Sequence, residues 1–143
     1  MMSPKSVITS TLKVGVVYKI EAPELITTSV PHYFVVIAID DDDNFLALST
    51  TQLEKKIEYL NRRGYDLDTL AHISPNTHNG LSKNSYFNCN EYYEVNKNGL
   101  IAKVQQQKLS VVGNFSEEEY DKIVDAILLS RINDIPKYLL KYS

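Results

Sequence analysis

The residues best suited to chemistry are a histidine and a hydroxyl cluster at the two ends of residues 31–52. His32 opens the first apolar run of this segment, and Thr50 and Thr51 close the second. Histidine gains and loses a proton near neutral pH, which suits general acid–base catalysis. A threonine hydroxyl can donate a hydrogen bond to an oxygen anion. The segment therefore predicts polar, reactive side chains at the end of an apolar β-hairpin.

Four cations follow the hydroxyl cluster on a stretch with helical periodicity. Leu53, Ile57 and Leu60 recur at spacings of four and three, and Gly64 favours a helix end, so residues 52–63 are predicted to form a helix. Its cations are Lys55, Lys56, Arg62 and Arg63. If this helix lines a groove, these side chains can bind a phosphate.

Each of these residues also has a purely structural interpretation, which the sequence leaves open. His32 can serve as a structural residue at the start of a strand. Thr50 can cap the helix that follows it, because threonine is a favoured N-cap residue. The four cations can form a solvated helix face.

Other residues with metal-binding or nucleophilic chemistry lack the spacing that such sites need. Residues 40–43 have the composition of half a calcium loop without its glycine and distal glutamate, so they predict a solvated hairpin turn. Cys89 is the only cysteine, and neither His72 nor His78 stands at zinc-ligand spacing from it. We expect no metal and no cofactor. A Cys89 nucleophile paired with either histidine remains an open alternative.

The elements that must position these residues are mainly strands. The run 32–39 is apolar on both faces, which predicts a central strand that is covered twice. Asn98-Gly99 predicts a hairpin turn. The remaining strands are predicted at residues 14–22, 45–48, 70–73, 85–87, 92–95 and 109–112. Ser116 and Glu119 match a capping box, which predicts a helix over about 116–131, and a second helix is predicted over 135–142.

Length and composition limit the class of protein. A chain of 143 residues fits one domain, which we place at residues 13–143 after a polar leader at 1–12. The net charge of −3 argues against a protein that coats duplex DNA. No apolar run approaches the ~20 residues that span a bilayer, so we expect no membrane partner. A single cysteine excludes an intrachain disulfide and favours a reducing compartment, so we expect a cytoplasmic protein.

The order of these elements resembles the PemK/MazF family of toxins. The pieces that carry the resemblance are residues 14–19, 33–37, 48–53 and 109–119. The resemblance implies a small SH3-like (PemK/MazF/CcdB-like) barrel, mainly β with C-terminal helices, that forms a homodimer. The family pairs an arginine at the start of the second strand with a threonine at the end of the third. Thr50 matches the threonine, with Thr51 beside it, and His32 stands at the arginine position.

The resemblance implies a toxin-like protein of a toxin–antitoxin module. On this interpretation the chain is a metal-independent endoribonuclease that acts on single-stranded RNA and binds an antitoxin-like protein. His32, Thr50 and Thr51 are then catalytic, and the four cations bind the substrate. The alternative is a non-catalytic binding module of the same fold that holds a peptide, an antitoxin segment or nucleic acid. The missing arginine and the acidic net charge favour this alternative.

Overall fold

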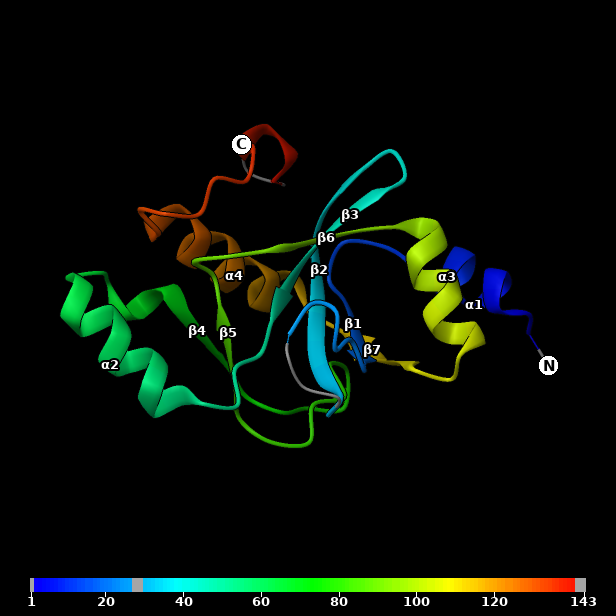
Figure 1. Cartoon of the computed structure of the whole chain (residues 1–143), viewed down its shortest axis with the longest axis horizontal. Coiled ribbons are helices and arrows are strands. Elements are labelled where there is room, and N and C mark those ends of the chain that lie inside the picture. Colours follow the sequence, from blue (N-terminus) through cyan, green and yellow to red (C-terminus); the bar gives the residue numbers. More distant parts are fainter. Residues whose placement is uncertain (1, 27–29, 141–143) are drawn as a thin grey trace.

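The computed structural model describes residues 2–26 and 30–140 (Figure 1). The elements, in chain order, are α1 (Pro4–Thr11), β1 (Val16–Ile20), β2 (His32–Asp40), β3 (Asp43–Leu48), α2 (Leu53–Arg63), the 3-10 helix η1 (Leu67–Thr69), β4 (Leu70–Ile73), β5 (Ser85–Asn88), β6 (Tyr93–Asn96), α3 (Lys97–Gln105), β7 (Leu109–Asn114), α4 (Glu117–Leu129) and the 3-10 helix η2 (Lys137–Leu139). These residues form a mixed α/β protein with antiparallel sheets, so the predicted mainly β fold with C-terminal helices is confirmed only in part. None of the helices they contain has both the length and the apolar character that a bilayer crossing requires.

Five strands form an antiparallel sheet in the order β6-β3-β2-β1-β7, and β4 and β5 form a separate two-stranded sheet. The two edge strands of the larger sheet, β6 and β7, do not pair with each other in the described residues, so the predicted barrel is not closed in this part of the chain. A loop covers β7 instead, where the Asn114 amide donates to the His78 carbonyl at 2.8 Å. Gly80 and Gly113 allow this close approach, because a Cβ atom at either position would overlap the opposite backbone.

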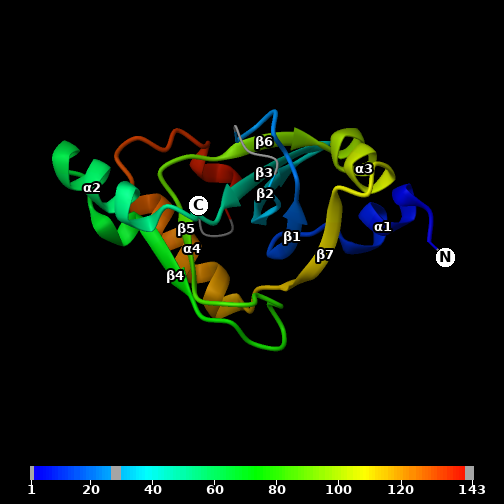
Figure 2. The ribbon, with the colours of Figure 1, turned by 60° about the horizontal axis from the view of Figure 1, so that its bottom comes forward.

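The central strand β2 is buried on both faces, as its two apolar faces predict. Phe34 and Val36 pack into the layer that α1 and α3 form. Val35 and Ile37 pack into the layer formed by α4, β4 and β5. Figure 2 shows α4 and the α1–α3 pair on opposite sides of the sheet. A register shift after Val36 places Ala38 in the second layer, so the expected alternation holds only for the first half of the strand.

The helix α1 occupies the segment for which the sequence predicts a polar leader. Ser3 caps it by accepting a hydrogen bond from the Ser6 amide at 3.1 Å. Ile8 is fully buried, and α1 packs against α3. One buried side chain on a polar helix gives too weak a periodicity for a sequence-based prediction.

The helix α3 begins where the sequence predicts a hairpin turn at Asn98-Gly99. The Asn96 side chain caps this helix by accepting a hydrogen bond from the Gly99 amide at 2.8 Å. Leu100 is buried at 1% exposure against the sheet. Packing of this helix against α1 and the sheet overrides the turn preference of the Asn-Gly pair.

Three other helical predictions have different outcomes. The prediction of α2 is confirmed, and Gly64 ends it in the left-handed region at φ 69°. The capping box of α4 is confirmed, since Ser116 Oγ accepts from the Glu119 amide and Glu119 Oε1 accepts from the Ser116 amide. Only the short η2 turn forms within 135–140, and the end of that predicted helix lies outside the described residues.

Candidate functional site

Most of the predicted catalytic and cationic side chains line one cavity of about 520 Å³, here called the hairpin cavity. His32, Thr50, Thr51 and Lys56 all contribute to its wall. The sheet explains this convergence, because β2 and β3 run antiparallel and pair Phe34 with Leu48. The residues two positions beyond that pair, His32 and Thr50, therefore emerge at the same end of the hairpin.

His32 is 8% exposed, and a backbone contact orients its ring. Its Nδ1 lies 2.7 Å from the carbonyl oxygen of Val30. A carbonyl oxygen can only accept, so Nδ1 carries a hydrogen and Nε2 is the nitrogen that can exchange a proton with a ligand. The same contact serves the structural interpretation, because it ties Val30, two residues before β2, to the first residue of the strand.

Thr50 is tied to the start of α2 without being its N-cap, which is Gln52. Its Oγ1 accepts a hydrogen bond from the Gln52 amide at 3.2 Å, and its own amide donates to the Tyr86 carbonyl at 2.8 Å. The hydroxyl hydrogen can still be donated to an oxygen of a ligand. Thr51 is exposed beside it.

Three further residues that line the hairpin cavity were missed by the sequence interpretation: Asn88, Glu91 and Tyr93. Glu91 Oε1 accepts from the Tyr93 hydroxyl at 3.2 Å and more weakly from Asn88 Nδ2 at 3.5 Å. Burial and the Glu91 carboxylate raise the pKa of Tyr93 to about 12, so its phenol stays a donor. The one sequence signal for these residues is the polar run 88–91 between two short strands.

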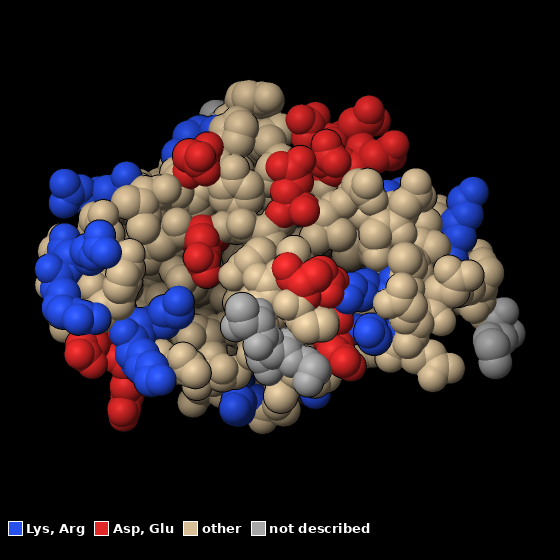
Figure 3. All heavy atoms as spheres, in the orientation of Figure 1, with Lys and Arg blue, Asp and Glu red and all other residues tan. Residues whose placement is uncertain are grey.

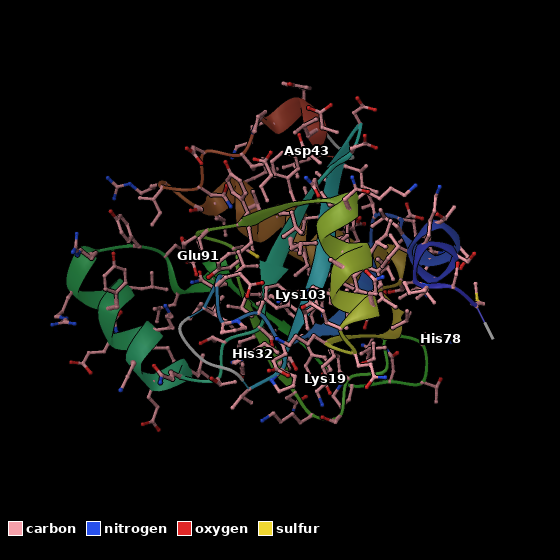
Figure 4. The ribbon with its side chains drawn as sticks, turned by 45° about the vertical axis from the view of Figure 1, so that its right-hand side comes forward. Lys19, His32, Asp43, His78, Glu91 and Lys103 are labelled. Atoms are coloured by element: carbon pink, nitrogen blue, oxygen red, sulfur yellow. The ribbon has the colours of Figure 1, made fainter. Side chains whose placement is uncertain are left out.

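The imidazole and the carboxylate approach the hairpin cavity from different parts of the chain. His32 comes from the start of β2, and Glu91 comes from the turn between β5 and β6. Figure 4 shows both side chains in the region between the larger sheet and α2. The cavity is therefore lined by a carboxylate and an imidazole, two groups that can accept and donate protons.

A second cavity of about 400 Å³, here called the helix cavity, continues along α2. It shares Gln52, Lys56, Asn88 and Glu91 with the hairpin cavity. Lys55 and Arg62 line it, as Lys56 does. Arg63 lines neither cavity and lies over the Tyr59 ring, 5.1 Å from its centroid.

The charges of the molecule are separated in space. Figure 3 shows Lys and Arg gathered over α2 and Asp and Glu gathered at the β2–β3 turn. Residues 40–43 supply the acidic turn, and the grooved side of α2 carries the cations. An anionic ligand is therefore attracted to the end of the molecule that contains the two cavities.

Cys89 does not have the environment of a nucleophile. It is fully buried, and desolvation raises the pKa of its thiol to about 12. His72 packs against Tyr86 with ring centroids 4.9 Å apart. Within residues 2–26 and 30–140, no group of three or more His, Cys, Asp or Glu side chains is arranged to hold a metal ion.

The hairpin cavity combines an imidazole and a carboxylate with a hydroxyl and a lysine, and this set suits reactions at a phosphodiester. No protein-family model matches the chain, and no curated protein matches it. The functional assignment below therefore depends on the residues of the two cavities.

Proposed function

We propose that the hairpin cavity is the active site of a toxin-like, metal-independent endoribonuclease that cleaves single-stranded RNA. One observation carries the proposal: His32 and Glu91 line the same cavity as Thr50 and Lys56. RNA cleavage without a metal needs a base, an acid and a positive group at the phosphate. The four side chains provide these three functions.

The proposed reaction is an internal transfer within the RNA backbone. The Glu91 carboxylate takes the proton of a 2′-hydroxyl, and the 2′-oxygen forms a bond to the adjacent phosphorus. The bond from phosphorus to the 5′-oxygen breaks, and the protonated His32 donates the Nε2 proton to that oxygen. The products are a 2′,3′-cyclic phosphate and a 5′-hydroxyl. Lys56 and the Thr50 hydroxyl stabilise the non-bridging phosphate oxygens.

The proposal includes the resemblance to the PemK/MazF toxins. Its support is the order of elements and the hydroxyl pair at the end of β3. An SH3-like ancestry of the sheet, a cytoplasmic homodimer and an antitoxin-like partner belong to the same proposal. His32 stands where the family has its arginine, so the proposed mechanism uses imidazole in place of guanidinium.

The first prediction tests the role of His32. His32→Asn places an amide nitrogen near the Nδ1 position, which can keep the contact with the Val30 carbonyl, and removes the Nε2 function. We expect cleavage of single-stranded RNA in EDTA to fall by about 100-fold or more, because general acid–base catalysis contributes at least that factor. The rate of fluorescent-oligonucleotide cleavage by the purified protein measures this.

The matched control is His78→Asn, since His78 is exposed and lines neither cavity. It should cleave at the wild-type rate. Equal cleavage by wild type and His32→Asn would remove His32 from the mechanism.

The second candidate function is a non-catalytic module that binds in the same cavity. The 8% exposure of His32 favours it, because a buried histidine tied to a backbone carbonyl can be purely structural. A wild-type protein that binds RNA or a peptide but cleaves no RNA supports this function. Growth arrest with loss of RNA on induced expression in a bacterium supports the nuclease.

A further inference from the structure

We propose that the helix cavity binds one nucleobase of the RNA strand, stacked on Tyr59, next to the phosphate held in the hairpin cavity. This inference rests on the proposed function and specifies its substrate as a strand of several unpaired nucleotides. A base that is paired in a duplex is stacked between its neighbours and cannot enter such a site.

The two cavities adjoin each other, because four residues line both of them: Gln52, Lys56, Asn88 and Glu91. A ligand bound near His32 that extends along α2 must therefore enter the helix cavity. At about 400 Å³ this cavity lies in the range of sites that bind small organic groups.

The walls of the helix cavity have the chemistry that a nucleobase requires. Leu60 and Leu70 are buried at 3% and 7% exposure and provide an apolar surface at the bottom of the cavity. Tyr59 is 39% exposed, so part of its surface is open to a ligand. Arg63 lies over the same ring and restricts its position. Single-stranded nucleic acids bind to proteins by stacking their bases on such aromatic side chains.

Cations and amide groups line the cavity beside these apolar side chains. Lys55 and Arg62 line the cavity and can bind the phosphates that flank the base. Asn90 uses both ends of its amide within the protein, on Thr69, Asn88 and Ser130. Among the described residues Asn88 Nδ2 donates only to Glu91, at a long 3.5 Å, so it can donate to an acceptor on the edge of the nucleobase.

The same walls would also accept an acidic peptide with an apolar side chain. The position next to the hairpin cavity favours the nucleotide, because Lys56 and Glu91 line both cavities and a single strand of RNA can occupy both. The peptide is an outcome that the experiment distinguishes.

The experiment compares the binding of two 2′-O-methyl RNA probes that cannot be cleaved by this mechanism, a dinucleotide and a hexanucleotide. We expect Tyr59→Leu to weaken hexanucleotide binding about tenfold, because it removes a stacking surface. Tyr59→Phe keeps the ring and should bind like the wild type. Dinucleotide binding should not change in either variant, since the dinucleotide can be held by the hairpin cavity alone.

Tyr138→Leu is the matched control, because Tyr138 is 75% exposed and lines neither cavity. If Tyr59→Leu binds the hexanucleotide as tightly as the wild type while the wild type still cleaves RNA, the base site is wrong and the proposed function stands. If the wild type neither cleaves RNA nor binds the hexanucleotide, both the proposed function and the base site are wrong. Tyr59-dependent binding of an Asp- and Leu-containing peptide without RNA binding assigns the cavity to a protein partner and overturns the base site.

Discussion

The protein contains two clusters of asparagine and glutamate that use the same chemistry for different purposes. The closed cluster, at the start of α4, consists of Asn76, Asn79 and Glu119. The open cluster, at the cavities, consists of Asn88, Asn90 and Glu91. The clusters differ in how many short hydrogen bonds the protein donates to the carboxylates of Glu119 and Glu91.

Every polar end of the closed cluster has a partner within the protein. Asn79 is fully buried, and its Oδ1 accepts from the amides of Asn76 and Leu81 at 3.1 and 3.0 Å. Its Nδ2 donates to the Ser74 carbonyl and to Glu119 Oε2, at 2.9 and 2.7 Å. The Glu119 carboxylate also accepts from the Ser116 amide as part of the capping box. This cluster attaches the β4–β5 loop to α4.

In the open cluster, the Asn90 amide has short hydrogen bonds within the protein, whereas the Glu91 carboxylate has long ones. Asn90 is buried and bonded to Thr69 and Ser130 from other parts of the chain. Glu91 is exposed, and its two contacts, at 3.2 and 3.5 Å, reach one carboxylate oxygen. The comparison indicates that a glutamate surrounded by short hydrogen bonds holds the fold, whereas one with long contacts at a cavity wall is available for a ligand.

The largest expected effect on stability comes from the closed cluster. Asn79→Ala leaves the partly buried amide of Asn76 and the buried amide of Leu81 without their acceptor, and a buried amide without a partner costs free energy. We expect the free energy of unfolding to fall by about 3 kcal/mol. Urea denaturation measures this loss. A loss well under 1 kcal/mol would show that the cluster does not hold the fold, whereas RNA cleavage per folded molecule should be unchanged.

The same substitution at the two glutamates should separate stability from activity. We expect Glu91→Gln to lower RNA cleavage by about 100-fold, because the amide cannot act as a base. We expect Glu119→Gln to lower the free energy of unfolding by about 1 kcal/mol, since it weakens the capping box, and to leave cleavage unchanged. Cleavage rates and urea midpoints of both variants test the comparison, and the reverse pattern would contradict it.

The smallest expected effect concerns the proton on Tyr93. Its pKa of about 12 in the folded protein lies above the ordinary tyrosine value of 10.0, through burial and the Glu91 charge. Its contribution to stability is therefore complete below pH 10 and is lost as the pH rises from 10 to 12. Absorbance titration of wild type against Tyr93→Phe isolates this phenol.

Removing the negative charge with Glu91→Gln should lower the pKa of Tyr93 toward its ordinary value, because that charge and its hydrogen bond contribute to the rise. A Tyr93 phenol that titrates near 10 in the wild type would show that Glu91 does not interact with it in solution.

Local sequence determined several elements because their signals lie within a few residues. The capping box of α4 uses only Ser116 and Glu119, and the end of α2 needs only a glycine at position 64. The apolar run of β2 predicts burial on both faces. By contrast, α1 and α3 form because the sheet offers them a surface, and each contributes only one fully buried side chain, Ile8 and Leu100.

The residues of the candidate site also fall into two groups, those that local sequence predicts and those that the tertiary fold brings together. The sequence by itself determined that His32 and Thr50 emerge together, since both flank one hairpin whose strands pair through local contacts. That Glu91 and Tyr93 line the same cavity follows from the tertiary fold alone, because pairing of β6 with β3 joins Tyr93 to Leu46 across 47 positions of the chain. The tertiary fold also decided that the sheet stays open, since a loop rather than a strand covers β7. Such pairings depend on packing between distant segments, and local residue patterns do not encode them.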